Sequence, residues 1–365
     1  MVLQSLRIAL IGPLPPPYGG MANQTEQLGE LLATAGAKVT LVRANAPYRP
    51  SWAGNLPGLR SLFRLVPYLM ALWRAAGSND IFHVMANSGW AWHLFAAPAV
   101  WIGHWRRVPV VVNYRGGEAK EFLLRSERLV RFTIRRASAL IVPSAFLKGV
   151  FTEFGMAAAI VPNIIDLSRF HSKVQSRSES PHLIVARNLE RLYDNETAIR
   201  AFRIVQDAFP RARLTVAGSG PEEQSLKQFA VEQGLCESVL FTGRLDRDAM
   251  ASLYRSANIL LNPSLADNMP NCLLEAWSSG VLVVSTNVGG IPLLAQDGIN
   301  ASLVPPSDPQ AMAQASIRLL KDEVESSRRV QMGLQEAHRY TWSQVRPTLE
   351  SIYQHVKLPA LERKK

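Results

Sequence analysis

Short apolar runs typical of β-strands alternate with segments of helical period along most of the 365-residue chain. In the first half a helical pattern follows nearly every run, and the runs are RIALIG, KVTLV, DIFHVM, VPVVVNY and SALIVPS. Helices between consecutive strands are the crossovers that parallel strands require, and they cover both faces of the sheet. The first half therefore predicts a doubly wound α/β domain.

The same alternation restarts after a polar, Ser-rich segment, HSKVQSRSESP, at residues 171–181. This segment has no apolar period and ends in Pro, as linkers often do. Further apolar runs follow it, namely HLIVAR, ARLTVAG, SVLFTG, NILLNPS and VLVVST. We therefore predict two Rossmann-like α/β domains facing each other across a cleft. Their ranges are 1–172 for the N-terminal domain, 173–182 for a linker, 183–338 for the C-terminal domain, and 339–358 for a last helix that can cross back to the first domain.

The charge balance is strongly basic, with a formal net charge of +11 and a pI near 9.9. Such an excess favours partners that carry phosphates, either nucleotides or an anionic membrane surface, although a protein can be basic without using its charge. No zinc-finger spacing and no aromatic RNA-binding strand accompanies the charge, so nucleic acid is not a predicted partner. The two cysteines, Cys236 and Cys272, form neither a metal-ligand pair nor a disulfide framework, which favours a reducing, cytoplasmic compartment.

Two apolar segments bear on membrane contact. WAWHLFAAPAVWIGHW, at residues 90–105, is shorter than the roughly 20 residues that span a bilayer, and we predict a buried helix there. PGLRSLFRLVPYLMALWRAAG, at residues 57–77, carries an apolar stripe at helical spacing with arginines beside it. That stripe is either part of the core or the face of a helix that lies on an anionic membrane. A cytoplasmic protein with peripheral attachment to the inner face of the membrane is the corresponding alternative.

Two glycine-rich loops each connect a predicted strand to the next helix. The first, GPLPPPYGGMA, carries Gly19 and Gly20, and the second, VAGSGPEEQSL, carries Gly218 and Gly220. Glycine lets the backbone approach a bound group closely, and the start of a helix attracts anions. Neither loop has the dinucleotide spacing G-x-G-x-x-G or the Gly-Lys-Ser/Thr of a P-loop. Each loop predicts a phosphate contact or, alternatively, a purely structural turn.

The segment PSLADNMPNCLLEAWSSG, at residues 263–280, surrounds the start of a further predicted helix. Its Pro270 suits the first turn, where a missing N–H costs nothing. Backbone amides at a helix start have no intrahelical partner and are available to a phosphate. The residues that we expect around such a phosphate are Asn268, Met269, Asn271, Cys272 and Leu273.

Two acids lie on either side of this helix start. Glu275, inside the helix, is placed to accept hydrogen bonds from two vicinal hydroxyls such as a ribose diol. Asp267, in the preceding loop, is placed to meet a polyhydroxylated substrate. The alternative is that both acids only complement the helix dipole, an effect below about 1 kcal/mol each. That alternative explains neither the apolar run CLLEAW nor the glycine-rich return VGGIP.

The stretch PSLADNMPNCLLEAWSSGVLVVSTNVGGIPLL resembles the donor-site segment of the retaining glycosyltransferases of the GT-B fold, glycosyltransferase family four. The order of the other pieces is similar too: GPLPPPYGG, VPNIIDLSRF, VARNLE, VAGSGPEEQSL and FTGRL. The resemblance implies two Rossmann-like domains and a nucleotide diphosphate-sugar as donor. It further implies retention at the anomeric carbon and a glycan or lipid-linked acceptor, as in polysaccharide or glycolipid biosynthesis.

Carried over residue by residue, Glu275 matches the second acid of the family's paired-glutamate motif, expected on the nucleotide ribose. Asp267 matches the first acid, expected on the donor sugar, although the family usually has Glu there. Gly19 and Gly20 match the loop that meets the diphosphate, and Arg187 matches the phosphate-binding Arg. The Lys usually found a few residues later is missing from RNLERLYDN, where Arg191 is the candidate substitute.

In the first domain, VVVNYRGGEAKEF stands where many relatives carry a His after the strand. Tyr114, Arg115 and Glu118 are the candidates to face the acceptor or the reacting centre, and we favour Arg115 as an electrostatic partner. His83 lies in a predicted strand, and we interpret it as a core histidine with satisfied hydrogen bonds.

No metal and no cofactor is expected. Asp246 and Asp248 form a D-x-D pattern, but they precede a helical segment, and capping of that helix is the favoured interpretation. Charge develops mainly on the leaving phosphate, which amides, helix starts and arginines can stabilise. The resemblance favours front-face attack, in which the leaving phosphate takes the proton of the acceptor. Two alternatives stay open, a nucleotide-sugar epimerase of the same fold and a non-catalytic nucleotide-sugar-binding partner of a glycan assembly complex.

Overall fold

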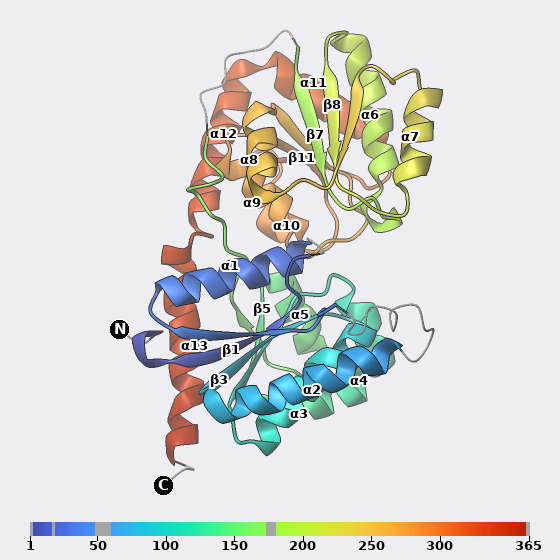
Figure 1. Cartoon of the computed structure of the whole chain (residues 1–365). Helices are drawn as coiled ribbons and strands as arrows, with labels where there is room; N and C mark the ends of the chain where they lie inside the picture. The colour runs from blue at the N-terminus through green and yellow to red at the C-terminus, as the bar shows by residue number, and fades with distance from the viewer. Residues whose placement is uncertain (1–2, 17–18, 48–59, 173–179, 363–365) are drawn as a thin grey trace. The chain divides into compact units, whose positions relative to one another are not determined.

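The computed structural model describes residues 3–16, 19–47, 60–172 and 180–362 (Figure 1). The chain forms two compact units. Unit 1 comprises Met1–Ile164 and Val345–Lys365, and unit 2 comprises Ile165–Gln344. Residues 165–172, assigned above to the first domain, belong to unit 2, because Ile165 and Phe170 are buried in its core. Most of the predicted linker, residues 173–179, lies outside the described residues.

Unit 1 contains a six-stranded parallel sheet in the order β2-β1-β3-β4-β5-β6. The chain starts at β1, pairs β2 on one side, and then crosses to β3 on the other. The strands are β1 (Arg7–Gly12), β2 (Lys38–Arg43), β3 (Ile81–Ala86), β4 (Val110–Tyr114), β5 (Ala139–Val142) and β6 (Ala159–Ile160). Its helices are α1 (Gly20–Thr34), α2 (Arg60–Ser78), η3 (Trp92–Ala96), α3 (Ala97–Trp105), α4 (Ala119–Ile134) and α5 (Ala145–Glu153).

Unit 2 repeats this plan with a second six-stranded parallel sheet, in the order β12-β11-β10-β7-β8-β9. The strands are β7 (His182–Ala186), β8 (Arg213–Ala217), β9 (Val239–Gly243), β10 (Ile259–Asn262), β11 (Leu282–Thr286) and β12 (Ser302–Val304). The helical elements are η4 (Arg191–Tyr193), α6 (Asn195–Ala208), α7 (Glu223–Glu232), α8 (Arg247–Ser256), α9 (Asn271–Ser278), α10 (Ile291–Leu294), α11 (Pro309–Lys321) and α12 (Glu323–His338). His182, placed above at the end of the linker, is the first residue of β7.

Both sheets have a point where the strand order reverses. In unit 1 it lies between β1 and β3, and in unit 2 between β7 and β10. In open α/β sheets, ligands bind beyond the carboxyl ends of the strands at such a reversal. The loops that follow β7 and β10, and those that follow β1 and β3, are therefore the first places to look for a site.

The last helix, α13 (Trp342–Glu362), joins unit 1 from Val345 onward. Its Tyr353 is fully buried and its hydroxyl lies 2.7 Å from Nδ1 of His83 on β3. Residues far apart in the sequence thus complete the core of the first unit.

The apolar segment at residues 90–105 forms η3 and α3, as a helical prediction requires, but it is not buried throughout. Trp92 is fully buried, whereas Trp105 at the end of α3 is exposed, because no element of the described chain covers that end. Among the described residues, no helix is both long and apolar enough to cross a bilayer.

Candidate functional site

Arg187 and Asp267 meet where the strand order of unit 2 reverses. Arg187 directly follows β7, and Asp267 lies in the loop after the neighbouring strand β10. Nη2 of Arg187 contacts Oδ2 of Asp267, and the two side chains are only 10% and 13% exposed. Both residues were predicted from the sequence as donor-site residues. The parallel sheet brings them together, because the carboxyl ends of neighbouring strands share one edge.

The guanidinium of Arg187 is held on several sides. Its plane lies over the ring of Tyr193, 4.0 Å from the ring centroid, and Nη1 lies 3.6 Å from Sγ of Cys272. Burial, the largest single effect, disfavours its charge. The carboxylate of Asp267 and smaller effects of Cys272 and Tyr193 together outweigh burial, so the pKa of Arg187 lies above its ordinary value. Within the described part of the chain, Nε of Arg187 is buried without a hydrogen-bond partner. One strong donor is thus left unsatisfied at this edge.

Cys272 and Glu275 lie on α9, the helix that follows Asp267. Burial raises the pKa of the Cys272 thiol to about 12, so the thiol is neutral. Burial also raises the pKa of Glu275, to about 7, although the hydroxyl of Tyr254 and the charges of Arg187 and Arg247 act in the opposite direction. Glu275 therefore titrates near neutrality, and partners that donate hydrogen bonds to its carboxylate would favour the ionised form.

The start of α9 differs in one detail from the expectation. The amide of Leu273 donates to the carbonyl oxygen of Pro270 at 3.2 Å, so it is not available to a phosphate. The bond arises because Pro270 stands at the N-cap and its carbonyl closes a tight first turn. In the preceding loop, the amide of Asn268 donates to Oδ1 of Asp267 at 2.7 Å. The side chains of Asn268 and Met269 are buried, and their contact with a phosphate stays a prediction.

Glycines bring the backbone segments of this site together. A Cβ atom on Gly218 would stand 1.9 Å from the carbonyl oxygen of Arg187, and one on Gly220 would stand 2.2 Å from that of Leu189. The two glycines of the second loop thus have a packing reason for their presence, since they support the segment that carries Arg187. The prediction that they also contact a donor stays a prediction.

Gly289, which the sequence analysis did not single out, supports Asp267 in the same way. It has φ +55, and a Cβ atom there would stand 2.1 Å from the carbonyl oxygen of Asp267. The next amide, that of Gly290, donates to the same oxygen at 2.9 Å. The signal in the sequence was the pair of glycines in VGGIP, directly after β11.

Arg191, the candidate substitute for the missing Lys, lies in η4 with its side chain 95% exposed. Its Nε lies 3.3 Å from Oε1 of Glu222, at the start of α7. Asp246, in contrast, accepts a hydrogen bond from the amide of Ala249 at 2.8 Å and caps α8, which confirms the capping interpretation.

In unit 1, Arg115 directly follows β4 and is held by two amide side chains. Nε donates to Oδ1 of Asn113 at 3.2 Å, and Nη1 donates to Oδ1 of Asn163. Burial lowers the pKa of Arg115 to about 10, a value at which the side chain still carries its charge at neutral pH. A buried cation with neutral partners is a ready site for an anion.

Asn113 links Arg115 to His83. Because its oxygen faces Arg115, its amide nitrogen faces His83, and Nδ2 lies 3.0 Å from Nε2. Nε2 must then accept, so the proton resides on Nδ1, which donates to the hydroxyl of Tyr353. Burial, with a smaller effect of the Arg115 charge, lowers the pKa of His83 to about 3. His83 is a neutral, satisfied core histidine, as predicted.

The other candidates of unit 1 lie in different settings. Tyr114 is fully buried against Phe151, and its hydroxyl lies 2.8 Å from that of Ser88. It is a core residue, which corrects its selection as a side chain that faces an acceptor; its position as the last, inward-pointing residue of β4 is the reason. Glu118 is exposed at the start of α4.

Gly19 and Gly20 lie at the start of α1, in the loop after β1. Gly19 is the N-cap residue, and a Cβ atom on it would meet no atom within 4 Å. Packing within the described chain therefore does not require glycine there, unlike at Gly218. Open space at a helix start beyond β1 agrees with the expected approach of a ligand.

Two family models match the chain. The model described as "Glycosyltransferase Family 4" matches residues 18–169, and the one described as "Glycosyl transferases group 1" matches residues 180–322. Among curated proteins, a phosphatidyl-myo-inositol mannosyltransferase of Mycobacterium leprae is 25% identical, over 96% of this chain and 97% of its own length. An N-acetyl-alpha-D-glucosaminyl L-malate synthase of Bacillus anthracis is 26% identical, over 84% of this chain and 86% of its own.

Solved structures agree in fold. Sucrose-phosphate synthase of Thermosynechococcus elongatus superimposes with a TM-score of 0.75 at 20% identity, over 96% of this chain and 99% of its own. HepE of Anabaena, in complex with UDP and glucose, superimposes with a TM-score of 0.74 at 16% identity, over 95% of this chain and 99% of its own.

Proposed function

The chain belongs to the glycosyltransferases of family four, and from this premise we propose that it is a retaining enzyme that transfers a hexose from a nucleotide diphosphate-sugar. Its two Rossmann-like units are those of the GT-B fold. The proposed acceptor is a glycan or a lipid-linked glycan precursor, and the proposed setting is polysaccharide or glycolipid biosynthesis. The curated relative from M. leprae is named for mannosyl transfer to phosphatidyl-myo-inositol, which supports a lipid-linked acceptor for this chain as well.

The observation that carries this proposal is the group formed by Arg187, Asp267 and Glu275 at the strand-order reversal of unit 2. Glu275 would accept hydrogen bonds from the two ribose hydroxyls of the donor, which would favour its ionised form. Asp267 would contact hydroxyls of the donor sugar, with its geometry fixed by Arg187 and the amide of Asn268. The buried, unpaired Nε of Arg187 would find its acceptor in a phosphate oxygen.

The chemistry that we propose needs a stabilised leaving phosphate. In unit 2, Arg187 and the start of α9 offer hydrogen-bond donors that are fixed before the nucleotide-sugar arrives. The loop at Gly19 and Gly20 is the further contribution that we propose for unit 1. In the front-face mechanism, the acceptor hydroxyl attacks on the side from which the diphosphate departs, and that phosphate takes the proton. We expect no requirement for a metal, since these cationic and amide groups would carry the charge, and chelation by EDTA should leave turnover unchanged.

Arg115 is the proposed contribution of unit 1. Its side-chain hydrogen-bond partners among the described residues are the amide oxygens of Asn113 and Asn163, which are neutral. It would therefore attract the negative charge that develops on the reacting groups or on an acidic acceptor.

The first experiment measures melting-temperature shifts of the full chain with UDP, GDP, ADP and CMP. We expect a shift with one nucleoside diphosphate, lost in Glu275→Ala and kept in Glu237→Ala, which removes an exposed glutamate of unit 2. UDP comes first in order, because structures of HepE were solved with UDP and with UDP-glucose. Absence of any shift, or a shift that Glu275→Ala retains, would contradict the proposed donor site.

One observation favours a second candidate, a non-catalytic nucleotide-sugar-binding partner of an assembly complex. The Lys that the family usually has after the phosphate-binding Arg is missing. Its candidate substitute, Arg191, is exposed and forms an ion pair with Glu222. Incubation with the matching donor and a panel of acceptors separates the two candidates. Nucleotide binding without any transfer would favour the second.

A further inference from the structure

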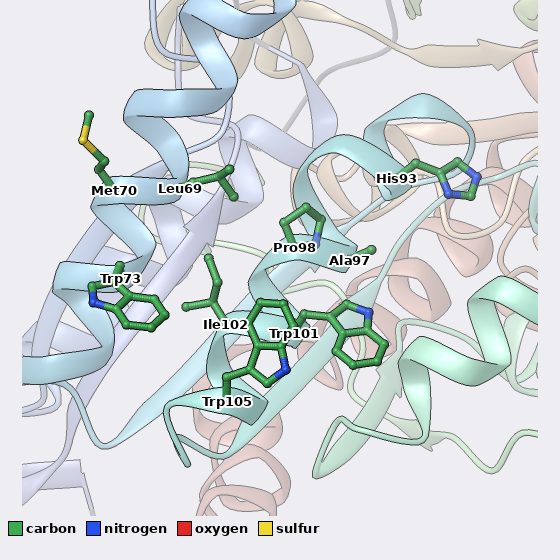
Figure 2. Close-up of a pocket in the computed structure, with 9 residues that line it drawn as sticks. All are labelled: Leu69, Met70, Trp73, His93, Ala97, Pro98, Trp101, Ile102 and Trp105. Carbon is green, nitrogen blue, oxygen red and sulfur yellow. The ribbon is translucent and has the colours of Figure 1, made fainter.

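A groove lined by aromatic and aliphatic side chains lies between α2 and α3 of unit 1 (Figure 2). Its volume is about 620 Å³, and nine residues line it, among them Leu69, Met70, Trp73, Trp101, Ile102 and Trp105. Figure 2 shows residues of α2 on one side of it and Trp101, Ile102 and Trp105 of α3 on the other. It belongs to a single unit and shares no residue with the site described above.

Three of the apolar side chains that line this groove are exposed. Trp73 is 50% and Trp105 64% exposed, and Met70 is exposed as well. Val66, Met70 and Trp73 follow one another at helical spacing along α2. The apolar stripe at residues 57–77 was predicted to lie either in the core or on a membrane. Its residues Val66, Met70 and Trp73 do not face the core of unit 1.

The exposed apolar surface continues from α3 onto α4. The rings of Trp101 and Phe132 lie 5.4 Å apart, and Phe132 and Leu129 of α4 are also exposed. We call Met70, Trp73, Trp105, Leu129 and Phe132 together the aromatic face. A contiguous exposed apolar surface of this kind marks a binding surface.

Arginines surround the aromatic face. The guanidinium of Arg106 lies over the ring of Trp73, 4.7 Å from its centroid. That of Arg136 lies over Trp101 at 4.3 Å and over Phe132 at 3.7 Å. Each cation thus lies over the face of an aromatic ring. Cations and indole rings also lie together at the interface of a bilayer, at the level of the lipid headgroups.

The part of the sequence that contains α2, α3 and α4 also carries most of the excess positive charge of the protein. Residues 60–140 contain 12 Lys and Arg but only four Asp and Glu, which accounts for eight of the eleven excess positive charges. A partner that meets this surface must therefore be both apolar and negatively charged. Anionic lipid offers both properties in one molecule, an acyl chain for the groove and a phosphate for the arginines.

We propose that the aromatic face docks on an anionic phospholipid bilayer, with one acyl chain of a bilayer lipid entering the groove between α2 and α3 and its phosphate lying against Arg106 or Arg136. The Trp73 and Trp105 rings insert at the level of the headgroups. The site is occupied by the bulk lipid of the membrane, not by the acceptor of the transfer reaction. Membrane binding at this face needs no nucleotide, so it can be tested independently of the proposed function.

The test is co-sedimentation of the full chain with vesicles, without any donor. Vesicles of phosphatidylcholine alone are compared with vesicles of equal parts phosphatidylcholine and phosphatidylglycerol. We expect binding to the anionic vesicles only. Arg106→Glu should weaken it roughly 25-fold, because each charge near an anionic surface contributes about fivefold and a charge reversal counts twice. Arg318→Glu, the same reversal at an exposed arginine of unit 2, should bind as the parent does.

The groove is tested by the Trp73→Ala/Trp105→Ala variant and by lipids brominated in the middle of the acyl chain. Bromine should quench the tryptophan fluorescence of the parent protein, and the variant should lose both the quenching and most of the binding. Leu293→Ala/Val324→Ala, which removes exposed apolar side chains of unit 2, is the matched control. Should the double variant not fold, Trp105→Ala alone replaces it, since that side chain is mostly exposed.

Several outcomes would overturn the proposal. Equal binding to neutral vesicles would remove the role of the arginines, and parental binding by the Trp variant would remove the role of the groove. Dimerisation of the free protein that the same Trp variant abolishes would assign the aromatic face to a second copy of the chain.

Discussion

Arg187 of unit 2 and Arg115 of unit 1 both directly follow a strand of a parallel sheet, and their charges are balanced in opposite ways. Arg187 contacts the carboxylate of Asp267, which raises its pKa. Arg115 has the amide oxygens of Asn113 and Asn163 as its partners, and burial lowers its pKa to about 10. The first pair is internally neutral, whereas the second group carries a net positive charge.

This difference separates two tasks. A neutral ion pair fixes two side chains in one geometry, which suits the recognition of a sugar and a phosphate by shape and direction. A buried cation with neutral partners costs free energy in the empty protein and regains it when an anion arrives. The comparison therefore predicts that changes at Arg187 act mainly on stability and donor binding, and changes at Arg115 mainly on turnover.

The largest expected effect comes from breaking the pair in unit 2. Arg187→Met leaves the carboxylate of Asp267 buried without its cation, and the free energy of unfolding should fall by about 3 kcal/mol. Urea denaturation measures this fall. Arg187→Met/Asp267→Leu, which removes both charges, should recover most of the stability without recovering transfer. Arg115→Met in unit 1 leaves only neutral amides behind and should cost about 1 kcal/mol. Equal losses at the two arginines would contradict the comparison.

Glu275 extends the comparison to a third ionisable group of unit 2. Its pKa is about 7 in the folded protein against an ordinary 4.5, so the folded state holds a proton that the unfolded chain releases. The free energy of unfolding should therefore fall as the pH rises from about 4.5 to about 7 and stay level above that. The total fall should be about 3 kcal/mol.

Denaturation at a series of pH values tests this. Glu275→Gln should lose the fall, and Arg187→Met should extend it to higher pH, because the charge of Arg187 lowers the pKa of Glu275. Nucleotide binding should weaken below pH 7, where the carboxylate is protonated. An unchanged pH profile in Glu275→Gln would show that another group is responsible.

The comparison can also be reversed by giving Arg115 a carboxylate. Asn113→Asp would place an anion where Arg115 now has an amide oxygen at 3.2 Å, as Asp267 does for Arg187. His83 can adapt by moving its proton to Nε2, since Tyr353 can then donate to Nδ1. We expect turnover to fall roughly 10- to 100-fold, because the positive charge is no longer available to the reaction. Steady-state kinetics with the matched donor measure this.

Arg115→Gln serves as the reference for that variant. If both substitutions leave turnover unchanged, Arg115 is a structural residue. If only Arg115→Gln lowers it, the shape of the side chain matters more than its charge.

The smallest expected effect is that of Tyr353→Phe. It removes the hydroxyl that accepts from Nδ1 of His83 and leaves a buried donor unpaired. The free energy of unfolding should fall by about 1 to 2 kcal/mol. Because the lost contact lies wholly in unit 1, the affinity for the nucleotide should stay as in the parent. A change in nucleotide affinity would show that the α13 contact influences unit 2.

The sequence alone was sufficient for five strands of each sheet and for the residues after β7 and β10, since apolar runs and their following polar residues are local signals. The edge strands β6 and β12, only two and three residues long, were missed because so short a run gives no such signal. Arg187 and Asp267 could be selected one by one, and the parallel sheet then explains their contact. The contact of Gly218 with the backbone of Arg187, and that of Gly289 with Asp267, could not be predicted, because each depends on the close approach of two loops. The core position of Tyr114 depended on which neighbours cover β4, and this too is non-local.

Along the sequence, the single range of unit 2 lies between the two ranges of unit 1. This order has a consequence for the nascent chain on the ribosome. Residues 165–344 can be synthesised and fold before Tyr353 has been translated. The core of unit 1 lacks its contact with His83 until then, because Tyr353 follows His83 by 270 positions. Until α13 has been translated, the part of the unit 1 core that Tyr353 buries needs protection by a chaperone or by the ribosome itself. Synthesis of α13 would then be the step that completes the core of unit 1, and deletion of α13 from Arg346 onward should appear as aggregation during synthesis, not as slow catalysis.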